Sequence, residues 1–205
     1  MKVAAVTITY NRLDLTKRTV ESFYSKTSVD GHLFVDNGST DGTREYIERF
    51  DHIYFDTNYG ITEAFKKAVE LLKGYDLILK LDNDVETVTE GIVERMVNFF
   101  LENGMHHVCS PVDLNIDPAY KPKVLTTNNK NGYNVYFTTH TGGAFQMMPY
   151  TIADKLVRDY LHFKHGDMAI GQFCRKHGYR PAYLTDLEMR HIGINQSTPA
   201  KEYVL

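Results

Sequence analysis

Two carboxylates stand one residue apart, directly after an apolar stretch of the chain. The stretch Leu77–Leu81 reads Leu-Ile-Leu-Lys-Leu and is followed by Asp82, Asn83 and Asp84. Carboxylates at positions i and i+2 after a strand can together reach a hard divalent cation and its water shell, so the segment is a candidate metal site. Asp-x-Asp is a short pattern with many chance matches, and a solvated acidic turn is the alternative interpretation.

A third carboxylate follows another short apolar stretch. Asp36 comes directly after His32–Val35 and precedes the turn sequence Asn37-Gly38. A carboxylate at such a strand end can accept a hydrogen bond from a base or a sugar, as the acidic residue of a nucleotide-binding βαβ unit does. The alternative is an aspartate that only shapes the Asn-Gly turn.

The elements that position these residues alternate in type along the first half of the chain. Short runs rich in Val, Ile and Leu predict strands, and apolar residues at helical spacing predict helices between them. The expected strands are Val3–Thr9, His32–Val35, a segment near 53–55, and Leu77–Leu81. The expected helices begin after Asn11, after a capping Asp41, near Ile61 and near Ile92. Repeated β-α units of this kind predict an α/β fold with a mostly parallel central sheet and helices on both faces.

Three polar loops follow predicted strands, at residues 9–12, 36–41 and 82–84. In a parallel sheet, ligands bind outside the carboxyl ends of the strands. We therefore expect these loops to converge on one edge of the sheet and to form one cleft.

The second half of the chain is less regular. Residues 113–136 are rich in Asn, Lys, Pro, Tyr and Gly and predict a long loop or an irregular hairpin. A strand is expected over 143–148 and a helix from Thr151. Another helix is expected from close to Asp167 to about His177, with Gly178 as the residue that stops it. Since no segment has the composition of a linker, residues 1–205 are interpreted as a single domain.

Composition excludes several classes of protein. The 205 residues carry a formal net charge of −3, which disfavours a nonspecific nucleic-acid binder. Cys109 and Cys174 match neither a zinc spacing nor a disulfide scaffold, which favours a reducing compartment. No apolar run approaches the ~20 residues of a transmembrane span, and Val3–Val6 is too short for a signal peptide. The expectation is a soluble cytoplasmic protein.

Taken together, these loops resemble the family 2 glycosyltransferases of the GT-A fold. The ordered matches span residues 3 to about 193, nearly the whole chain, and the stretch 35–43 is the most specific of them. The matching segments are Val6-Thr7-Ile8-Thr9-Tyr10-Asn11-Arg12, Val35-Asp36-Asn37-Gly38-Ser39-Thr40-Asp41-Gly42-Thr43, Asn58-Tyr59-Gly60, Leu81-Asp82-Asn83-Asp84, Thr141-Gly142-Gly143-Ala144-Phe145, Gly166-Asp167 and His191.

The resemblance implies a nucleotide-sugar donor, usually a UDP-sugar, bound mainly by residues 1–110, with the acceptor and the catalytic base in residues 111–205. It assigns donor contacts to Thr9, Tyr10, Arg12, Asp36, Asn58, Gly60, Asp82, Asn83, Gly142 and Gly143. It also assigns Asp84 and His191 as ligands of Mn²⁺ or Mg²⁺, with Asp82 nearer the ribose or a metal-bound water. Read without the resemblance, His191 is an ordinary surface or core histidine, and Gly142-Gly143 is a strand bulge or a turn.

The resemblance further implies that Asp167 is the general base of an inverting transfer to the hydroxyl of a glycan or other acceptor. Asp167 precedes a helical pattern, and a helix N-terminus favours an ionised carboxylate by ~0.3–1 kcal/mol. The alternative is that Asp167 only caps that helix.

The chain departs from the family pattern at several positions. Ile8 replaces a common Pro, and Gly166 replaces the Glu that usually precedes the base. Other polar or glycine positions of the family are occupied here by Lys66, Ala68, Ala169 and Phe173. These changes leave two further hypotheses open. One is a catalytically silent nucleotide-sugar-binding protein. The other, a nucleotidyltransferase, ranks lower because no Gly-rich basic loop follows the first strand.

Three aromatic residues of the second half have two interpretations. Tyr133, Tyr136 and Phe137 can stack against an acceptor sugar ring or pack within a strand.

Overall fold

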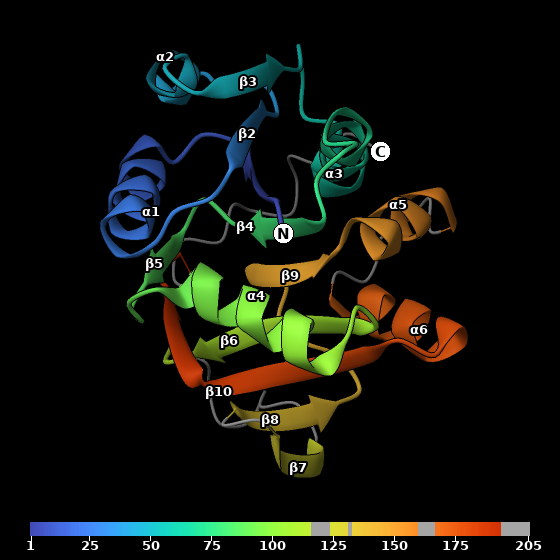
Figure 1. Cartoon of the computed structure of the whole chain (residues 1–205). Coiled ribbons are helices and arrows are strands. Elements are labelled where there is room, and N and C mark those ends of the chain that lie inside the picture. Colours follow the sequence, from blue (N-terminus) through green and yellow to red (C-terminus); the bar gives the residue numbers. More distant parts are fainter. Residues whose placement is uncertain (116–123, 131–132, 160–166, 194–205) are drawn as a thin grey trace.

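In the computed structural model of the chain, residues 1–115, 124–130, 133–159 and 167–193 are described. Within these residues a ten-stranded sheet forms the centre, and helices cover both of its faces (Figure 1). The first half contains β1 (Val3–Thr9), α1 (Leu13–Lys26), β2 (Gly31–Asp36), α2 (Thr43–Ile47), β3 (Asp51–Tyr54), α3 (Gly60–Leu71), β4 (Leu77–Leu81), β5 (Val85–Thr87) and α4 (Ile92–Asn103). The second half contains β6 (His107–Asp113), β7 (Val124–Lys130), β8 (Tyr133–Thr138), β9 (Phe145–Pro149), α5 (Tyr150–Asp159), α6 (Asp167–His177) and β10 (Arg180–His191).

The first half builds the parallel part of the sheet, as the sequence predicts. Strand β1 pairs in parallel with β2 on one side and with β4 on the other, and β3 extends the sheet beyond β2. Every residue of β4 is buried, as expected for a strand covered on both faces. The carboxyl ends of β1, β2 and β4 therefore point to the same edge, where the predicted loops follow.

The second half makes the sheet mixed. The strand order is β3-β2-β1-β4-β9-β6-β10-β8-β7, with β5 paired to β10. Strand β9 is antiparallel to β4, whereas β10 is parallel to β6 and antiparallel to β8. The region 113–136, expected as a long loop or irregular hairpin, contributes the antiparallel pair β7–β8. Strands β5, β6 and β10 were not expected from the sequence.

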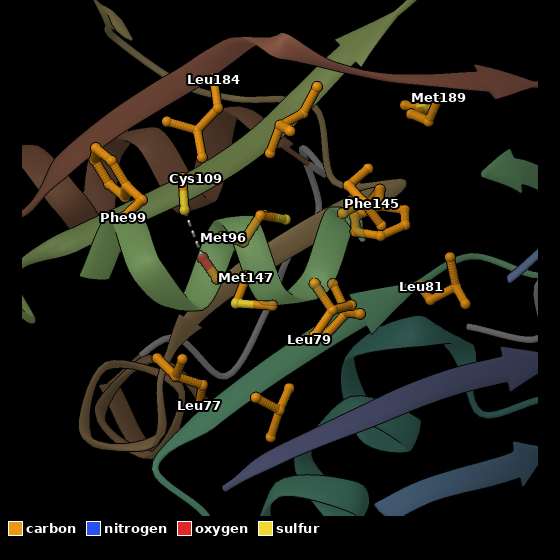
Figure 2. Close-up of a cluster of buried hydrophobic side chains, with 14 of the residues drawn as sticks. Leu77, Leu79, Leu81, Met96, Phe99, Cys109, Phe145, Met147, Leu184 and Met189 are labelled. Carbon is orange, nitrogen blue, oxygen red and sulfur yellow. Dashed lines mark hydrogen bonds between the residues drawn. The ribbon is translucent and has the colours of Figure 1, made fainter. Parts of the chain in front are cut away.

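The core has one large apolar cluster on each face of the sheet, and a small third cluster is formed by Val20, Phe34 and Ile47. One cluster lies against α1 and α4, and Figure 2 shows Leu77, Leu79 and Leu81 of β4 together with Met96 and Phe99 of α4. The other cluster lies against α3, α5 and α6. Each fully buried side chain of this size stabilises the fold by ~1.5–3 kcal/mol, so the position of β4 is strongly fixed.

Helix boundaries agree with several expectations. Helix α6 begins at Asp167 and ends at His177, and Gly178 follows with a φ of 74°. Asp41 accepts hydrogen bonds from the backbone N–H groups of Leu13 and Thr43, the first residues of α1 and α2. None of the helices in the described parts of the chain is both long and apolar enough to cross a membrane.

Candidate functional site

Three loops meet at the carboxyl edge of the sheet through direct hydrogen bonds. The backbone N–H of Asn11 donates to Ser39 Oγ at 2.8 Å, and the N–H of Thr40 donates to Asn11 Oδ1 at 2.8 Å. Asn83 Nδ2 donates to the carbonyl of Asn11 at 3.3 Å. The convergence expected for the loops after β1, β2 and β4 is therefore confirmed, with Asn11 at its centre.

The loop after β1 has a strained backbone. Asn11 and Arg12 both lie in the left-handed region, with φ values of 57° and 65°. This conformation costs an ordinary L-residue roughly 1–2 kcal/mol and is tolerated best by Asn, Asp and Gly. Strain of this kind persists only where surrounding contacts enforce it, and it concentrates at functional sites. Here the enforced turn places the Arg12 guanidinium beside Asp84, with Nη1 donating to Asp84 Oδ2 at 2.8 Å.

A fourth loop, after β3, is attached to the loop after β2. Asn37 Nδ2 donates to Asn58 Oδ1 at 2.8 Å, and Asn37 Oδ1 accepts from the N–H of Tyr59 at 3.0 Å. Asn58 Oδ1 also accepts from the N–H of Gly60 at 2.9 Å, which fixes the start of α3. The φ of Gly60 is 82°, a value that glycine adopts without strain.

These loops enclose a cavity of about 250 Å³. Its lining residues are Ile8, Tyr10, Arg12, Asn37, Asn58, Ile61, Asp82, Asn83, Asp84 and His191. Most of the side chains that the sequence singled out therefore surround one space. His191 reaches it from the last residue of β10, far along the chain from the others.

Asp84 lies between two basic side chains. Its Oδ2 accepts from Arg12, and its Oδ1 is 3.1 Å from His191 Nε2. The backbone N–H of His191 donates to Asp113 Oδ1 at 3.0 Å, so the histidine is held by its main chain as well. Gly193 lies so close that a Cβ at that position would be 2.0 Å from Asp84 Oδ2.

The charges of this group are coupled. Burial opposes ionisation of Asp84, yet the hydrogen bond and charge of His191, with the charges of Arg12 and Lys80, hold the pKa of Asp84 below its ordinary value. The hydrogen bond to Asp84 raises the pKa of His191 above its ordinary value. Asp84 is thus kept ionised in a largely buried position.

Asp82 has a different partner. Lys80 Nζ forms an ion pair with Asp82 Oδ1 and donates to the carbonyl oxygen of Gly143 at 2.7 Å. The side chain of Lys80 is 10% exposed and that of Asp82 is 29% exposed. The acidic motif is therefore attached to the loop before β9 through a buried lysine.

The side chains of Asp84 and His191 fit a divalent cation that takes its remaining ligands from water and substrate. Asp84 Oδ1 and His191 Nε2 are 3.1 Å apart, so both atoms would be within reach of one cation. Among the described residues, no three His, Cys, Asp or Glu side chains form a metal-binding group. Mg²⁺ commonly uses only one or two protein carboxylates and takes its other ligands from water and substrate phosphates.

The loop that contains Gly142 and Gly143 is clamped from several strands. Tyr183 Oη on β10 accepts from the N–H of Gly142 at 2.7 Å, and Ser110 Oγ on β6 donates to its carbonyl at 2.9 Å. Gln146 Nε2 on β9 donates to Thr141 Oγ1 at 2.7 Å. Neither glycine lines the cavity, but the Lys80 contact connects Gly143 to it.

Helix α6 docks against the start of the same loop. A Cβ at Gly171 would lie 2.5 Å from the carbonyl oxygen of Thr139 and 2.6 Å from His140 Cβ, so only glycine permits this approach. Asp167, the first residue of α6, stands one helical turn before this contact. The side chain of Asp167 lies outside the described part of the structure, and its role stays a prediction.

Two predicted donor-binding residues lie beneath the cavity rather than on its wall. Asp36 is fully buried, with Oδ1 accepting from Thr9 Oγ1 at 3.0 Å and Oδ2 accepting from the N–H of Ser39 at 3.0 Å. Thr9 is also fully buried. In this arrangement both residues shape the loop after β2, and their contact with a base stays a prediction.

Three of the positions that depart from the family pattern are buried. Ala68 and Phe173 are buried in the cluster on the α3–α5–α6 face, and Ala169 is also buried. Lys66 lies on the outer side of α3, beside Tyr59, in a separate surface groove.

Strand alternation separates the three aromatic residues. Tyr133 and Phe137 pack against the core cluster beneath α4, so the packing interpretation holds for them. Tyr136 lies on the opposite face of β8 and is 38% exposed.

Four residues of the site were missed from the sequence. They are Lys80, Ser110, Tyr183 and Gly193. Only Lys80 carried a signal, because a lysine within the buried run Leu77–Leu81 requires a partner for its charge. The others depend on contacts between segments distant in the chain.

Comparisons with known proteins identify the family and the fold. Residues 4–173 match the family model described as Glycosyl transferase family 2. A search of curated proteins found no match.

Several solved structures share the fold. GalNAc-T7 with UDP, GalNAc and Mn²⁺ superposes with a TM-score of 0.71 at 12% identity, covering 93% of this chain and 44% of that one. The mannosyltransferase PcManGT from Pyrobaculum calidifontis, in complex with GDP-Man and Mn²⁺, gives 0.70 at 16% identity, covering 93% and 56%. Residues 1–349 of S. aureus TarS in complex with UDP give 0.64 at 17% identity, covering 92% and 60%. The chain thus spans about half the length of these structures, and at such identities the likeness shows the GT-A fold.

Proposed function

This chain belongs to glycosyl transferase family 2, and from that premise we propose that it transfers a sugar from a nucleotide-sugar donor to an acceptor hydroxyl. The observation that carries the proposal is the Asp84–His191 pair, 3.1 Å apart on the wall of the cavity between the strand-end loops. This donor set suits a cation bound to a diphosphate. A UDP-sugar is the proposed donor and a glycan hydroxyl the proposed acceptor, and UDP in two of the similar structures supports the donor.

Asp84 and His191 would hold Mn²⁺ or Mg²⁺ on the donor diphosphate. When bound, the cation neutralises the negative charge that gathers on the departing nucleoside diphosphate. Arg12 stands beside the same carboxylate, and its guanidinium has the planar fork that pairs with phosphate oxygens. Tyr10, Asn58 and the Asp82 side chain line the remaining wall for the nucleoside.

The proposed reaction is a single displacement with inversion. The acceptor oxygen forms a bond to the anomeric carbon while the bond from that carbon to the diphosphate oxygen breaks, and its electron pair leaves with the nucleoside diphosphate. The acceptor proton passes to the Asp167 carboxylate, an effect typically worth 10²–10⁴-fold in rate. The support for Asp167 is its place at the start of α6, one turn before Gly171 contacts the Thr139–His140 backbone.

The clamped loop at Gly142 and Gly143 is proposed to contact the donor sugar. Because Tyr183 and Ser110 already bind the amide groups of Gly142, the loop needs little rearrangement when the sugar arrives. A preorganised site loses less entropy on binding.

We extend the proposal to organisation and setting. Residues 1–205 form one domain, with residues 1–110 supplying most donor contacts and residues 111–205 the acceptor side. His191 is an exception, since β10 returns it to the donor cavity. A cytoplasmic setting is supported by Cys109 and Cys174, both free and buried.

The test is calorimetric binding of UDP together with release of sugar from UDP-sugars, each with and without Mn²⁺. Asp84→Ala should abolish the Mn²⁺-dependent binding, whereas Asp14→Ala, an exposed acid on α1, should retain it. Normal binding and turnover by Asp84→Ala would refute the assignment.

Two other outcomes identify the alternatives. UDP binding without sugar release over a long incubation identifies a silent binding protein, a result consistent with Gly166 in place of the usual Glu. Release of pyrophosphate from a nucleoside triphosphate identifies a nucleotidyltransferase.

A further inference from the structure

Lys80 is a buried cation in the middle of the sheet. It lies on β4, opposite Val6 of β1 and opposite Gln146 of β9. Its neighbours on the strand, Leu79 and Leu81, point into the apolar cluster on the other face. An ammonium group in such a place is costly to bury unless it is paired, so its contacts are obligatory parts of the fold.

The contacts of Lys80 join two parts of the candidate site. Nζ pairs with Asp82 Oδ1 and donates to the carbonyl oxygen of Gly143. Because Lys80 stands on a central strand, its ammonium group has little freedom to move away from either partner. The side chain of Asp82, in contrast, is 29% exposed and reaches the cavity wall.

The two acids of the motif therefore differ in their cationic partners. Asp84 is paired with Arg12, whose side chain is 24% exposed and extends from a loop, and it also faces His191. A cation can take the place of Arg12 beside Asp84 because a loop arginine can turn toward a diphosphate. The charge of Lys80 also acts on Asp84, but Lys80 forms its ion pair with Asp82. Beside Asp82 this charge is fixed, so a divalent cation on the same carboxylate would meet its repulsion at the shortest distance.

We propose that Lys80 is a positioning residue that withholds Asp82 from the metal, leaving the cation to Asp84 and His191 and reserving Asp82 for a hydroxyl group of the donor. This inference rests on the proposed function. The carbonyl of Gly143 holds the Lys80 ammonium group beside Asp82, so the ion pair can persist while Asp82 accepts a hydrogen bond from a donor hydroxyl in the cavity. Lys80 thus sets which of two neighbouring carboxylates serves the metal.

The test measures Mn²⁺ affinity directly, from the electron paramagnetic resonance signal of free Mn²⁺ at saturating UDP. Lys80→Met keeps the length of the side chain and removes its charge, so Asp82 becomes available as a ligand. We expect Mn²⁺ to bind about fivefold more tightly or better in Lys80→Met. Most of the gain should be lost in Lys80→Met/Asp82→Asn, where only the smaller effect of Lys80 on Asp84 remains. The charge-preserving Lys80→Arg should keep the wild-type affinity.

A single substitution in the wild-type background gives a second measurement, which does not depend on the folding of Lys80→Met. Asp82→Asn alone should leave Mn²⁺ affinity within about twofold, since Asp82 is not a ligand. A tenfold loss in Asp82→Asn overturns the inference, and so does unchanged or weaker Mn²⁺ binding by a folded Lys80→Met.

Failure of the inference is distinguishable from failure of the proposed function. Mn²⁺ and UDP binding by the wild type, with no gain in Lys80→Met, removes only the role of Lys80. If the wild type binds no Mn²⁺ in the presence of UDP, the proposed metal-dependent function is refuted. In that case, Mn²⁺ binding that appears in Lys80→Met and requires Asp82 still supports the inference about Lys80. If Lys80→Met binds no Mn²⁺ either, the proposed function and the inference are both overturned.

Discussion

Substitution of Gly193 by alanine should disable the cation site from a position that carries no functional group. A Cβ there would lie 2.0 Å from Asp84 Oδ2 and 2.7 Å from Asp84 Cγ. Ordinary van der Waals contact begins at 3.4 Å, so the carboxylate and residue 193 must move apart by about 1.4 Å. Such a shift disrupts the contacts of Asp84 with Arg12 at 2.8 Å and with His191 at 3.1 Å.

Since a misplacement of 1 Å can cost about 10²-fold, we expect Mn²⁺-dependent UDP affinity to fall by roughly 10- to 100-fold, or about 1.4–2.7 kcal/mol. Calorimetry of UDP binding in Mn²⁺ measures this loss. Gly178→Ala is the control, because it is also a glycine-to-alanine change but its added Cβ meets no atom within 4 Å. Its φ of 74° strains an alanine backbone, so this variant reports the effect of lost stability without a clash at Asp84. That control should lose ~1 kcal/mol of stability and keep wild-type affinity. Wild-type affinity in Gly193→Ala would refute the reasoning.

Three further predictions concern the framework of the site. Burial lowers the pKa of His32 from 6.5 to about 3, so between these pH values the unfolded chain takes up a proton that the folded chain does not. The free energy of unfolding should therefore decrease as the pH is lowered, and His32 should account for about 2 kcal/mol of the decrease between pH 7.5 and pH 5. Urea denaturation at the two pH values measures this decrease, and His32→Gln should make it smaller. Gly171→Ala should destabilise the fold by ~1–3 kcal/mol, because its Cβ would meet the backbone oxygen of Thr139 at 2.5 Å, and an unchanged melting temperature would contradict the docking of α6. Thr9→Val removes the hydroxyl that donates to buried Asp36 and should lower the free energy of unfolding by ~1–3 kcal/mol. The same urea denaturation measures this loss, and a wild-type value would show that the hydrogen bond does not stabilise the fold.

The parallel half of the fold could be predicted because its signals are local. Leu77–Leu81 is bounded by polar residues and appears as β4 with the expected ends. Val3–Thr9 is rich in β-branched residues and appears as β1. Because ligands bind at the carboxyl ends of parallel strands, the positions of these strands also predict that their loops converge on one site.

The strands of the second half could not be predicted in the same way. The sequence of β10 contains Pro181 near its start and charged residues throughout, and its pairing with β6 shifts register between Leu184 and Glu188. Such a strand is specified by its neighbours rather than by its own pattern, because β propensity depends on context. β6 and β5, both paired to β10, were missed with it.

The residues of the candidate site also divide into those that the sequence indicates and those that it does not. The resemblance to family 2 gave His191 through the order of its motifs, and the structure brings it to Asp84. Lys80 is detectable as a charge within a buried strand, although its partners are not. Gly193 carries no sequence signal, since its need for glycine arises from Asp84, a residue distant along the chain.

Asp84 and His191 are proposed to hold a divalent cation against the diphosphate of the donor. Diffraction from crystals grown with UDP and Mn²⁺, recorded at the manganese absorption edge, tests this proposal most directly. We expect one anomalous peak within about 2.3 Å of Asp84 Oδ1 and His191 Nε2, with the diphosphate oxygens as further ligands. A manganese ion bound to the diphosphate but remote from both side chains would contradict it.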